Sequence, residues 1–139
     1  YKEIETLPEF IDAVRLRVAV VEEQGFEPGR EPDEEDKIAR HFIALADDKV
    51  VATARFRKTK KEEIKIERMV TKKEYRGRGI GTRLVNYIIA EATKLNPKRI
   101  WLQSQVQSQK FYEKNGFVTV SEPYDLYGIL HIDMQYNQK

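Results

Sequence analysis

A short glycine-rich stretch constrains the fold of this chain more than any other feature. Residues 76–82 hold three glycines at alternate positions and are followed directly by an apolar run of helical period. Glycine lets the main chain turn tightly and lets a ligand approach its N–H groups. The helix that follows offers unpaired N–H groups and the positive end of its dipole. The stretch therefore predicts a turn that binds an anion such as phosphate, with added charge from Arg76 and Arg78.

The turn differs from two common phosphate motifs. A P-loop ends in Gly-Lys-Ser/Thr, whereas this chain has Gly81-Thr82-Arg83. A dinucleotide-binding fingerprint has the spacing G-x-G-x-x-G, and here the third glycine comes one residue early. Taken alone, the triplet also fits a plain strand-to-helix turn without a ligand, so its interpretation depends on the flanking sequence.

Sequence periodicity before the turn predicts one helix and several antiparallel strands. A first edge strand is expected at 2–4, and Thr6 with Glu9 forms a capping box that starts a helix. Its expected buried stripe is Phe10, Ile11, Val14, Val18 and Val21, with Arg15 and Arg17 pointing elsewhere. Residues 25–40 read as an acidic, mobile lid with a helical turn near Glu34.

Alternation predicts strands at 42–46, 50–57 and 64–71. In the third of them two sets of side chains are expected on opposite sides, Ile64, Ile66, Arg68 and Val70 against Lys65, Glu67 and Met69.

After the turn we expect a helix at 80–95, a strand at 100–102, a helix at 105–115, and strands at 117–121 and 129–136 that close the sheet. Because a helix connects 64–71 to 100–102, these two strands should be parallel. The prediction is a single α/β domain over residues 1–139, with a mixed, mostly antiparallel central sheet flanked by helices and parallel only around the glycine turn.

The flanks of the turn resemble the GNAT N-acetyltransferase superfamily. The resemblance rests on Lys65 to Thr71 before the turn, and on Gln105 and Tyr112 after it, the latter within Phe111-Tyr112-Glu113-Lys114-Asn115-Gly116-Phe117. It extends over nearly the whole chain. One poorly characterised bacterial and archaeal branch shares further features, namely Leu16-Arg17, Glu23-Gln24, Glu31-x-Asp33-x-x-Asp36, His41 and Gly128-Ile129-x-His131-x-x-Met134. Leu130 and Leu126 depart from that pattern.

The resemblance implies the GNAT fold, in which the strand before the turn splays from the next parallel strand, and acetyl-coenzyme A as co-substrate. Its pantetheine amides would pair with the exposed strand edge, and its pyrophosphate would lie on the turn. The implied cofactor-binding residues are Met69, Val70, Thr71, Arg76, Gly77, Arg78, Gly79, Ile80, Gly81, Thr82, Gln105, Phe111 and Tyr112. Gln105 would anchor the start of the second helix against the pantetheine arm, although a glutamine without a role also fits.

Three residues are candidates for the chemistry. The resemblance places the Tyr112 hydroxyl near the sulfur as a general acid, with a core aromatic as the alternative. It makes Glu67 a base or water-orienting carboxylate, unless Glu67 is an ion-paired sheet residue. His131 shares a strand face with Asp133, where it could accept a proton or make a structural hydrogen bond. His41 reads mainly as structural.

Composition narrows the chemistry and the partners. The chain has no cysteine, and its two histidines are far apart in sequence, so no metal site is expected. No membrane span or signal segment is apparent, which predicts a cytoplasmic protein. Residues 22–36 hold eight acids against one base, net −7, and residues 57–83 hold eleven bases against four acids, net +7. The acidic tract could attract a cationic amine, or serve solubility alone.

The leading interpretation is an N-acetyltransferase that transfers an acetyl group directly, within a ternary complex, to a primary amine of a small molecule or a lysine-like group. A non-catalytic acyl-coenzyme A binding module is the first alternative. A nucleic-acid binder is the last, because aromatic residues and a recognition-helix pattern do not accompany the basic tract. Monomer and homodimer both remain open.

Overall fold

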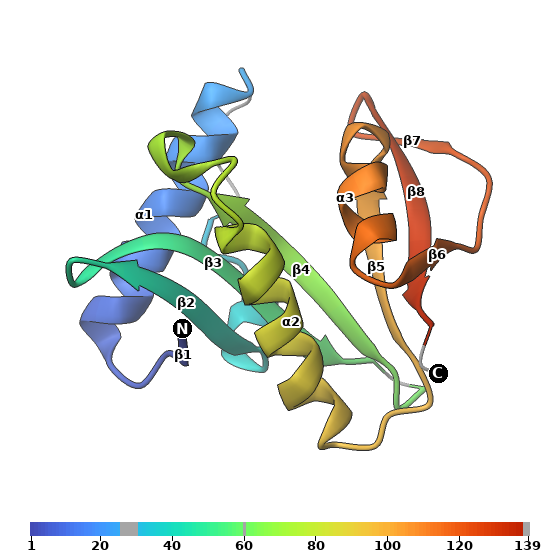
Figure 1. Cartoon of the computed structure of the whole chain (residues 1–139), viewed down its shortest axis with the longest axis horizontal. Helices are drawn as coiled ribbons and strands as arrows, with labels where there is room; N and C mark the ends of the chain where they lie inside the picture. Colours follow the sequence, from blue (N-terminus) through green and yellow to red (C-terminus); the bar gives the residue numbers. More distant parts are fainter. Residues whose placement is uncertain (26–30, 60, 138–139) are drawn as a thin grey trace.

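A computed structural model describes residues 1–25, 31–59 and 61–137 as a central sheet with helices on both faces (Figure 1). In chain order the elements are β1 (Lys2–Glu3), α1 (Leu7–Glu23), η1 (Glu34–Lys37), β2 (Arg40–Ala46), β3 (Lys49–Lys58), β4 (Ile64–Thr71), η2 (Lys73–Tyr75), α2 (Ile80–Thr93), β5 (Ile100–Gln105), η3 (Val106–Ser108), α3 (Gln109–Lys114), β6 (Phe117–Thr119), β7 (Tyr124–Leu126) and β8 (Ile129–Tyr136). In Figure 1, α2 and α3 lie in front of the sheet and α1 lies behind it. The predicted fold class is confirmed.

The strand order is β1-β2-β3-β4-β5-β8-β6, with β7 paired to β8. Only β4 and β5 pair in parallel among the described strands, as the connecting helix predicts. Two expectations were wrong. β8 does not close the sheet at its edge but inserts between β5 and β6. β7 was missed, because a strand of three residues is too short to show an alternating pattern in the sequence.

Helix α1 begins as predicted but buries a different face. The Thr6 hydroxyl accepts a hydrogen bond from the Glu9 main-chain N–H, and the Glu9 carboxylate accepts one from the Thr6 main-chain N–H, which completes the capping box. The buried residues are Ala13, Leu16, Arg17 and Val20, while Ile11 is 41% exposed. The predicted stripe was therefore rotated, because a buried ion-pairing role for Arg17 does not show in hydrophobic periodicity.

The second helix packs on the opposite face as its sequence predicts. α2 buries Leu84, Val85, Ile88, Ile89 and Ala92. The sheet contributes side chains such as Phe42, Phe56 and Ile66 to the same core. Burying an aliphatic side chain contributes roughly 1.5–3 kcal/mol, so this face holds the glycine turn at the start of α2 firmly against the sheet.

Behind the sheet, a buried cluster of opposite charges joins α1, the acidic segment and the strands. We call it the arginine–carboxylate cluster: Arg17, Glu31, Asp33, Asp36, Arg55, Glu67 and Arg68. Arg55 Nη1 lies 2.6 Å from Asp33 and 2.6 Å from Asp36, and Arg17 Nη2 lies 2.8 Å from Asp36. Arg17 also pairs with Glu31. Both guanidinium groups are almost fully buried.

The cluster corrects the interpretation of the acidic segment. Both roles considered for the acidic tract, attraction of an amine and solubility, require exposed acids, but Glu31, Asp33 and Asp36 bind internal arginines. The helical turn expected near Glu34 is present as η1. The mobile lid falls partly on residues 26–30, which lie outside the described residues.

Replacing Arg55 with Met should test what the cluster contributes to stability. The change removes a buried cation that contacts three carboxylates, Asp33, Asp36 and Glu67, and breaking buried pairs in this way typically costs about 3–5 kcal/mol. Arg15→Met is the matched control, because Arg15 lies on α1 with its side chain 78% exposed, and its change should stay within about 0.5 kcal/mol. Urea unfolding measures both free energies. A loss from Arg55→Met as small as the control's would contradict a stabilising role.

Acid should unfold the protein through the same carboxyl groups. Burial alone would raise the pKa values of Asp33 and Asp36, but hydrogen bonds from Arg55, and for Asp36 also from Arg17, lower both below their usual range. A carboxyl whose pKa is lower in the folded state stabilises fully above its unfolded value, near 3.9 for Asp, and less as the pH falls below it. Stability should therefore decline below about pH 4, and less steeply in Asp36→Asn, when urea unfolding is repeated across pH.

Candidate functional site

The site begins where β4 separates from β5. The two strands pair only through Ile64–Ile66 and Ile100–Leu102, although β4 continues to Thr71 and β5 to Gln105. Figure 1 shows them diverging beyond this point, with α2 beside one strand and α3 beside the other. The edge of β4 from residue 67 onward is thus not paired with β5, and its main-chain groups face the gap. The splayed parallel pair expected from the sequence is confirmed.

A bulge in β4 redirects the side chains at the start of the gap. Thr53 pairs with Val70 and Arg55 with Glu67, so three steps along β4 oppose two along β3. Arg68 adopts a φ of 58° there, in the left-handed region. Because residues opposite one another share a face, Val70 lies on the Glu67 side of the sheet. The predicted strict alternation, with Val70 opposite to Glu67, was therefore wrong beyond the bulge.

The glycine turn leaves the first turn of α2 open to a ligand. Gly77 and Gly79 have φ values of 77° and 79°, which favour glycine. Gly79 is the N-cap of α2, so no side chain caps the helix. The N–H groups that open α2 therefore keep their hydrogen-bonding capacity at the positive end of the dipole.

Gly81 sets how closely α2 approaches the far side of the gap. A Cβ atom at this position would lie 3.3 Å from the Phe111 ring and 3.7 Å from Thr71 Oγ1. The contact with Thr71 would be an ordinary one, but the contact with the Phe111 ring would be tight, so the ring would have to shift slightly to admit a side chain. The third glycine thus has a steric role in addition to any contact with a ligand.

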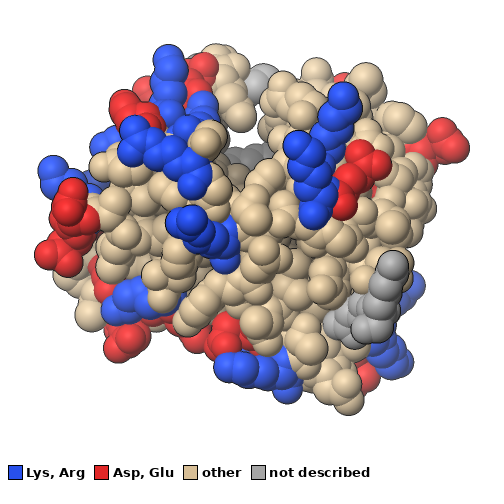
Figure 2. All heavy atoms as spheres, in the orientation of Figure 1, with Lys and Arg blue, Asp and Glu red and all other residues tan. Residues whose placement is uncertain are grey.

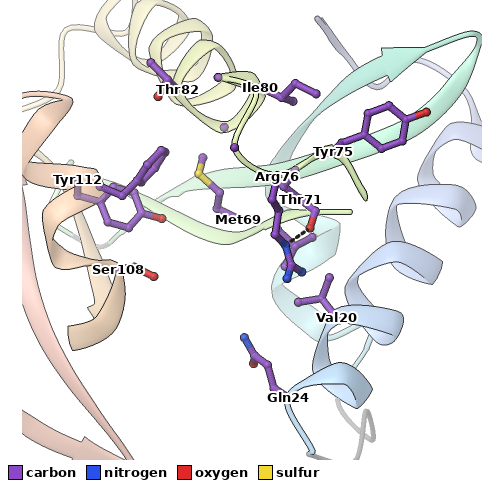
Figure 3. A pocket seen from close by; sticks show the side chains of 15 residues that line it. Val20, Gln24, Met69, Thr71, Tyr75, Arg76, Ile80, Thr82, Ser108 and Tyr112 are labelled. Atoms are coloured by element: carbon purple, nitrogen blue, oxygen red, sulfur yellow. Dashed lines mark hydrogen bonds between the residues drawn. The ribbon is translucent and has the colours of Figure 1, made fainter. Parts of the chain in front are cut away.

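A cavity of about 580 Å³ runs from the glycine turn into the gap between β4 and β5 (Figure 3). We call it the glycine-turn cavity. It brings together most of the residues expected to bind a cofactor, and it is lined by Val20, Gln24, Met69, Val70, Thr71, Tyr75, Arg76, Gly77, Gly79, Ile80, Gly81, Thr82, Ser108, Phe111 and Tyr112. Arg78 and Gln105 were expected here and do not line it.

A second cavity of about 280 Å³ continues the first, and we call it the His131 cavity. It shares six lining residues with the glycine-turn cavity, Val20, Gln24, Met69, Val70, Ser108 and Tyr112. The residues that it adds include Glu67, Gln103, Gln105 and His131. All three residues predicted to carry chemistry, Tyr112, Glu67 and His131, therefore line one cavity.

Tyr112 lies on the wall common to both cavities. Its ring packs edge-on against Phe111 at 5.0 Å and Phe117 at 5.6 Å between centroids, which fixes its position. Figure 3 shows its hydroxyl directed into the cavity. Burial raises the pKa of Tyr112 to about 12, so the hydroxyl stays protonated at neutral pH and is able to donate.

Glu67 is buried among three cations. Its carboxylate lies 2.9 Å from Arg55, 2.8 Å from Arg57 and 3.1 Å from Lys65. Burial alone would raise its pKa, but the hydrogen bond from Arg57 and the charges of Lys65 and Arg55 lower it below the usual range. A carboxylate held in this way accepts protons poorly. The geometry favours the ion-paired alternative over a general base.

His131 of β8 lines the second cavity, and one of its ring nitrogens is hydrogen-bonded to the main chain. Its Nδ1 lies 2.8 Å from the Ile129 carbonyl oxygen, so in the neutral ring Nδ1–H donates and Nε2 carries the lone pair. No described residue hydrogen-bonds to Nε2. His41 instead contacts the Asp36 carbonyl oxygen at 3.0 Å, which supports the structural interpretation of that histidine.

Gln105 was placed on the wrong element by the sequence. It is the last residue of β5 and not part of a helix, since strand pairing with β8 continues to Gln105 and His131. α3 begins only at Gln109, after η3. Gln24 and Ser108 also line both cavities. From the sequence, Gln24 was noted only as a shared feature without a role, and Ser108, which lies in a polar stretch without a motif, was not singled out.

The rim of the glycine-turn cavity is basic. Figure 2 shows Lys and Arg side chains on both sides of a hollow between the loop before α2 and α3. Arg76 donates to both Glu23 oxygens, at 2.5 and 3.0 Å, and to the Thr71 carbonyl oxygen, so an anion would compete with Glu23 for it. The exposed Arg78 packs over the Tyr75 ring and has no acidic partner among the described residues.

The described residues show neither a metal-ligating cluster nor a membrane-spanning helix. They contain no group of three or more metal-ligating side chains. None of the described helices is long and apolar enough to cross a membrane.

Comparisons with known proteins agree with this geometry. The model of the acetyltransferase (GNAT) domain matches residues 13–138. Protein ElaA of Escherichia coli K12 is 32% identical over 87% of this chain and 81% of its own. Its crystal structure superposes with a TM-score of 0.87, covering 96% of this chain and 93% of its own at 29% identity.

Two other solved structures are similar. An acyl-CoA N-acyltransferase from Pseudomonas aeruginosa gives a TM-score of 0.84 at 29% identity, covering 96% of this chain and 93% of that one. A Bacillus anthracis protein solved with acetyl coenzyme A gives 0.65 at 25% identity, covering 73% and 64%.

Charge reversal at Arg78 should weaken binding of a polyanionic ligand at the glycine turn. Arg78→Glu replaces an attractive charge with a repulsive one without disturbing a glycine, and we expect coenzyme A to bind about tenfold more weakly. The difference should shrink as salt is added. Lys98→Glu is the control, because it makes the same reversal beyond the other end of α2. Calorimetry with coenzyme A measures both, and equal affinities in the two variants would contradict an anion site at the turn.

Proposed function

Because the chain belongs to the GNAT acetyltransferase domain family and is an acyltransferase, we propose that it transfers an acetyl group from acetyl-coenzyme A to a primary amine. The transfer occurs directly, while both substrates are bound. The protein acts as a single catalytic domain and is located in the cytoplasm. One observation carries the proposal: the unpaired edge of β4 leads from the glycine turn to the Tyr112 hydroxyl along one continuous cavity.

The residues present fit the co-substrate. Main-chain N–H groups at the start of α2 are suited to hold a pyrophosphate, helped by Arg76 and Arg78. The edge formed by Met69, Val70 and Thr71 offers main-chain partners to the two amides of pantetheine. Gly81 keeps α2 close to Phe111, where any Cβ would intrude. When bound, acetyl-coenzyme A supplies an activated thioester.

The residues of the His131 cavity handle the protons. His131 Nε2 takes a proton from the amine nitrogen, so that the nitrogen attacks in its neutral form. As the C–N bond forms, the C–S bond breaks and the sulfur departs as a thiolate, which Tyr112 stabilises by donating a hydrogen bond. His131 and the acylated nitrogen then each release one proton to solvent, and solvent protonates the thiolate. The products are an N-acetylated amine and coenzyme A.

The weak acidity of the Tyr112 hydroxyl limits its role as a proton donor to sulfur. Its pKa of about 12 lies above that of a thiol, near 8.5, so complete proton transfer to sulfur is uphill. Most of its benefit comes from the hydrogen bond formed as negative charge develops on sulfur. Glu67 has a different part, since it neutralises Arg55, Arg57 and Lys65 beside the cavity and does not act as the base.

Direct transfer suits the side chains available. No cysteine exists in the chain to form an acyl-enzyme. A non-catalytic acyl-coenzyme A binding module would need no hydroxyl at the inner end of the cavity, so the Tyr112 geometry favours catalysis.

The proposal is tested by release of free thiol from acetyl-coenzyme A in the presence of a panel of primary amines, with mass spectrometry of the products. Binding of coenzyme A is measured separately by calorimetry. Binding without thiol release for any amine would favour the non-catalytic module. An absence of both would overturn the proposed function.

Replacing Tyr112 with Phe should slow transfer without weakening binding of coenzyme A. The ring packing against Phe111 and Phe117 is kept, and only the hydrogen bond to sulfur is lost. Removing a donor of this kind typically costs about 10²-fold in kcat. Tyr87→Phe is the matched control, because Tyr87 packs on Phe42 at 6.0 Å and does not line either cavity. Unchanged kcat in Tyr112→Phe would reduce Tyr112 to a packing residue.

A further inference from the structure

The sheet face at the His131 cavity carries an ordered row of polar side chains. In the pairing of β5 with β8, Gln105 is opposite His131 and Gln103 is opposite Asp133. Opposite residues share a face, and residues two apart on one strand lie on the same side about 7 Å apart. Asp133 itself does not line the cavity, but it stands one step beyond His131 on the same side of β8, opposite Gln103, which does line it.

Asp133 differs from the buried acids of the arginine–carboxylate cluster. Glu31, Asp33, Asp36 and Glu67 each contact at least one arginine. Asp133 is half-buried. Its carboxylate nevertheless forms no ion pair, since no Lys, Arg or His nitrogen among the described residues lies within 4.0 Å of it. A half-buried carboxylate without a counterion is costly, and a bound cation would offset that cost.

The neighbours of Asp133 position it without neutralising it. The Tyr124 hydroxyl donates to Asp133 Oδ1 at 2.5 Å, and the Tyr124 ring stacks on His131 at 6.3 Å between centroids. Asp133 Oδ2 receives no hydrogen bond from the described residues. Tyr124 thus ties the carboxylate to the histidine at the reaction site, and one carboxylate oxygen keeps its capacity to accept from a ligand.

Two basic side chains of β4 contact other acids. Lys65 contacts Glu67 at 3.1 Å and Gln103 at 2.8 Å, and Arg68 contacts Glu31 at 2.9 Å and Asp33 at 2.8 Å. Neither side chain forms an ion pair with Asp133. A cation at Asp133 therefore meets a carboxylate that is not in contact with any cation of the described residues.

We propose that the acceptor is an aliphatic diamine, whose reacting amine lies between Tyr112 and His131 while its second ammonium group binds Asp133. The proposal rests on the proposed function and specifies its substrate class. The step of about 7 Å between His131 and Asp133 matches an extended chain of roughly four or five methylene groups between two nitrogens. Asp133 acts in recognition of the distal charge and takes no part in the transfer.

The first test compares amines on the unmodified protein. Thiol release is measured with 1,4-diaminobutane and 1,5-diaminopentane against butylamine and pentylamine, which have the same chain lengths but one charge. We expect KM about tenfold lower for the diamines, a difference that shrinks with added salt. The short 1,2-diaminoethane should behave as a monoamine. Equal KM values for diamines and monoamines would overturn the proposal.

The second test removes the charge at Asp133. Asp133→Asn keeps the side-chain shape and an oxygen that accepts from Tyr124, and it should raise KM for both diamines about tenfold, with little change for monoamines or in KM for acetyl-coenzyme A. Asp125→Asn is the matched control, since Asp125 is an exposed carboxylate on β7. Identical behaviour of the two variants would overturn the proposal. Circular dichroism checks that both variants are folded. If Asp133→Asn is not folded, Asp133→Glu replaces it, because this change keeps the charge and moves it by one methylene group.

A binding measurement separates this proposal from the proposed function. Calorimetry of 1,5-diaminopentane into protein saturated with coenzyme A should show binding that weakens about tenfold in Asp133→Asn and not in Asp125→Asn. Monoamines acetylated as well as diamines, with no effect of Asp133→Asn, would overturn the diamine site and leave the acetyltransferase intact. Diamine binding that depends on Asp133, without acetylation of any amine, would support the site and overturn the transfer reaction.

Discussion

The parting of two parallel strands after three residue pairs is the constraint on which the site depends. Because β4 and β5 stop pairing at Ile66 and Leu102, the edge of β4 loses its partner and a cavity opens through the sheet. The bulge at Arg68 coincides with this point and turns Val70 to the Glu67 side. An unpaired edge inside a protein is costly unless something hydrogen-bonds to it, which is why a ligand with two amides is a natural occupant.

Charged residues serve two purposes in this protein, inside the fold and at the cavity rim, and the sequence alone does not show which residues serve which purpose. Most of the described acids between residues 31 and 36 are used inside the fold, where they bind Arg17, Arg55 and Arg68 and attach their segment to the rear of the sheet. Part of the basic tract remains at the rim of the glycine-turn cavity. The bipolar sequence thus yields a basic cavity rim and an internally neutralised cluster, and not two opposite surface patches.

The sequence predicted what depends on neighbours along the chain. The capping box at Thr6, the glycine turn and the apolar face of α2 are local patterns, and all are confirmed. The rotated face of α1, the bulge at Arg68 and the extension of β5 to Gln105 were missed, because each depends on pairing with residues distant in sequence. The partners of Glu67 and the isolation of Asp133 likewise exist only once the strands are assembled.

The placement of the acidic groups suits the chemistry of an amine acceptor. A carboxylate touching the reacting nitrogen would favour its ammonium form and raise its pKa, which would suppress the neutral nucleophile. In the structure the acid that lines the His131 cavity together with Tyr112 and His131, Glu67, is already bound by three cations and attracts an ammonium group weakly. The uncompensated acid, Asp133, lies one step farther along β8. In the proposed reaction, attraction of the substrate and deprotonation of its reacting nitrogen would thus fall to different positions, so that one need not oppose the other.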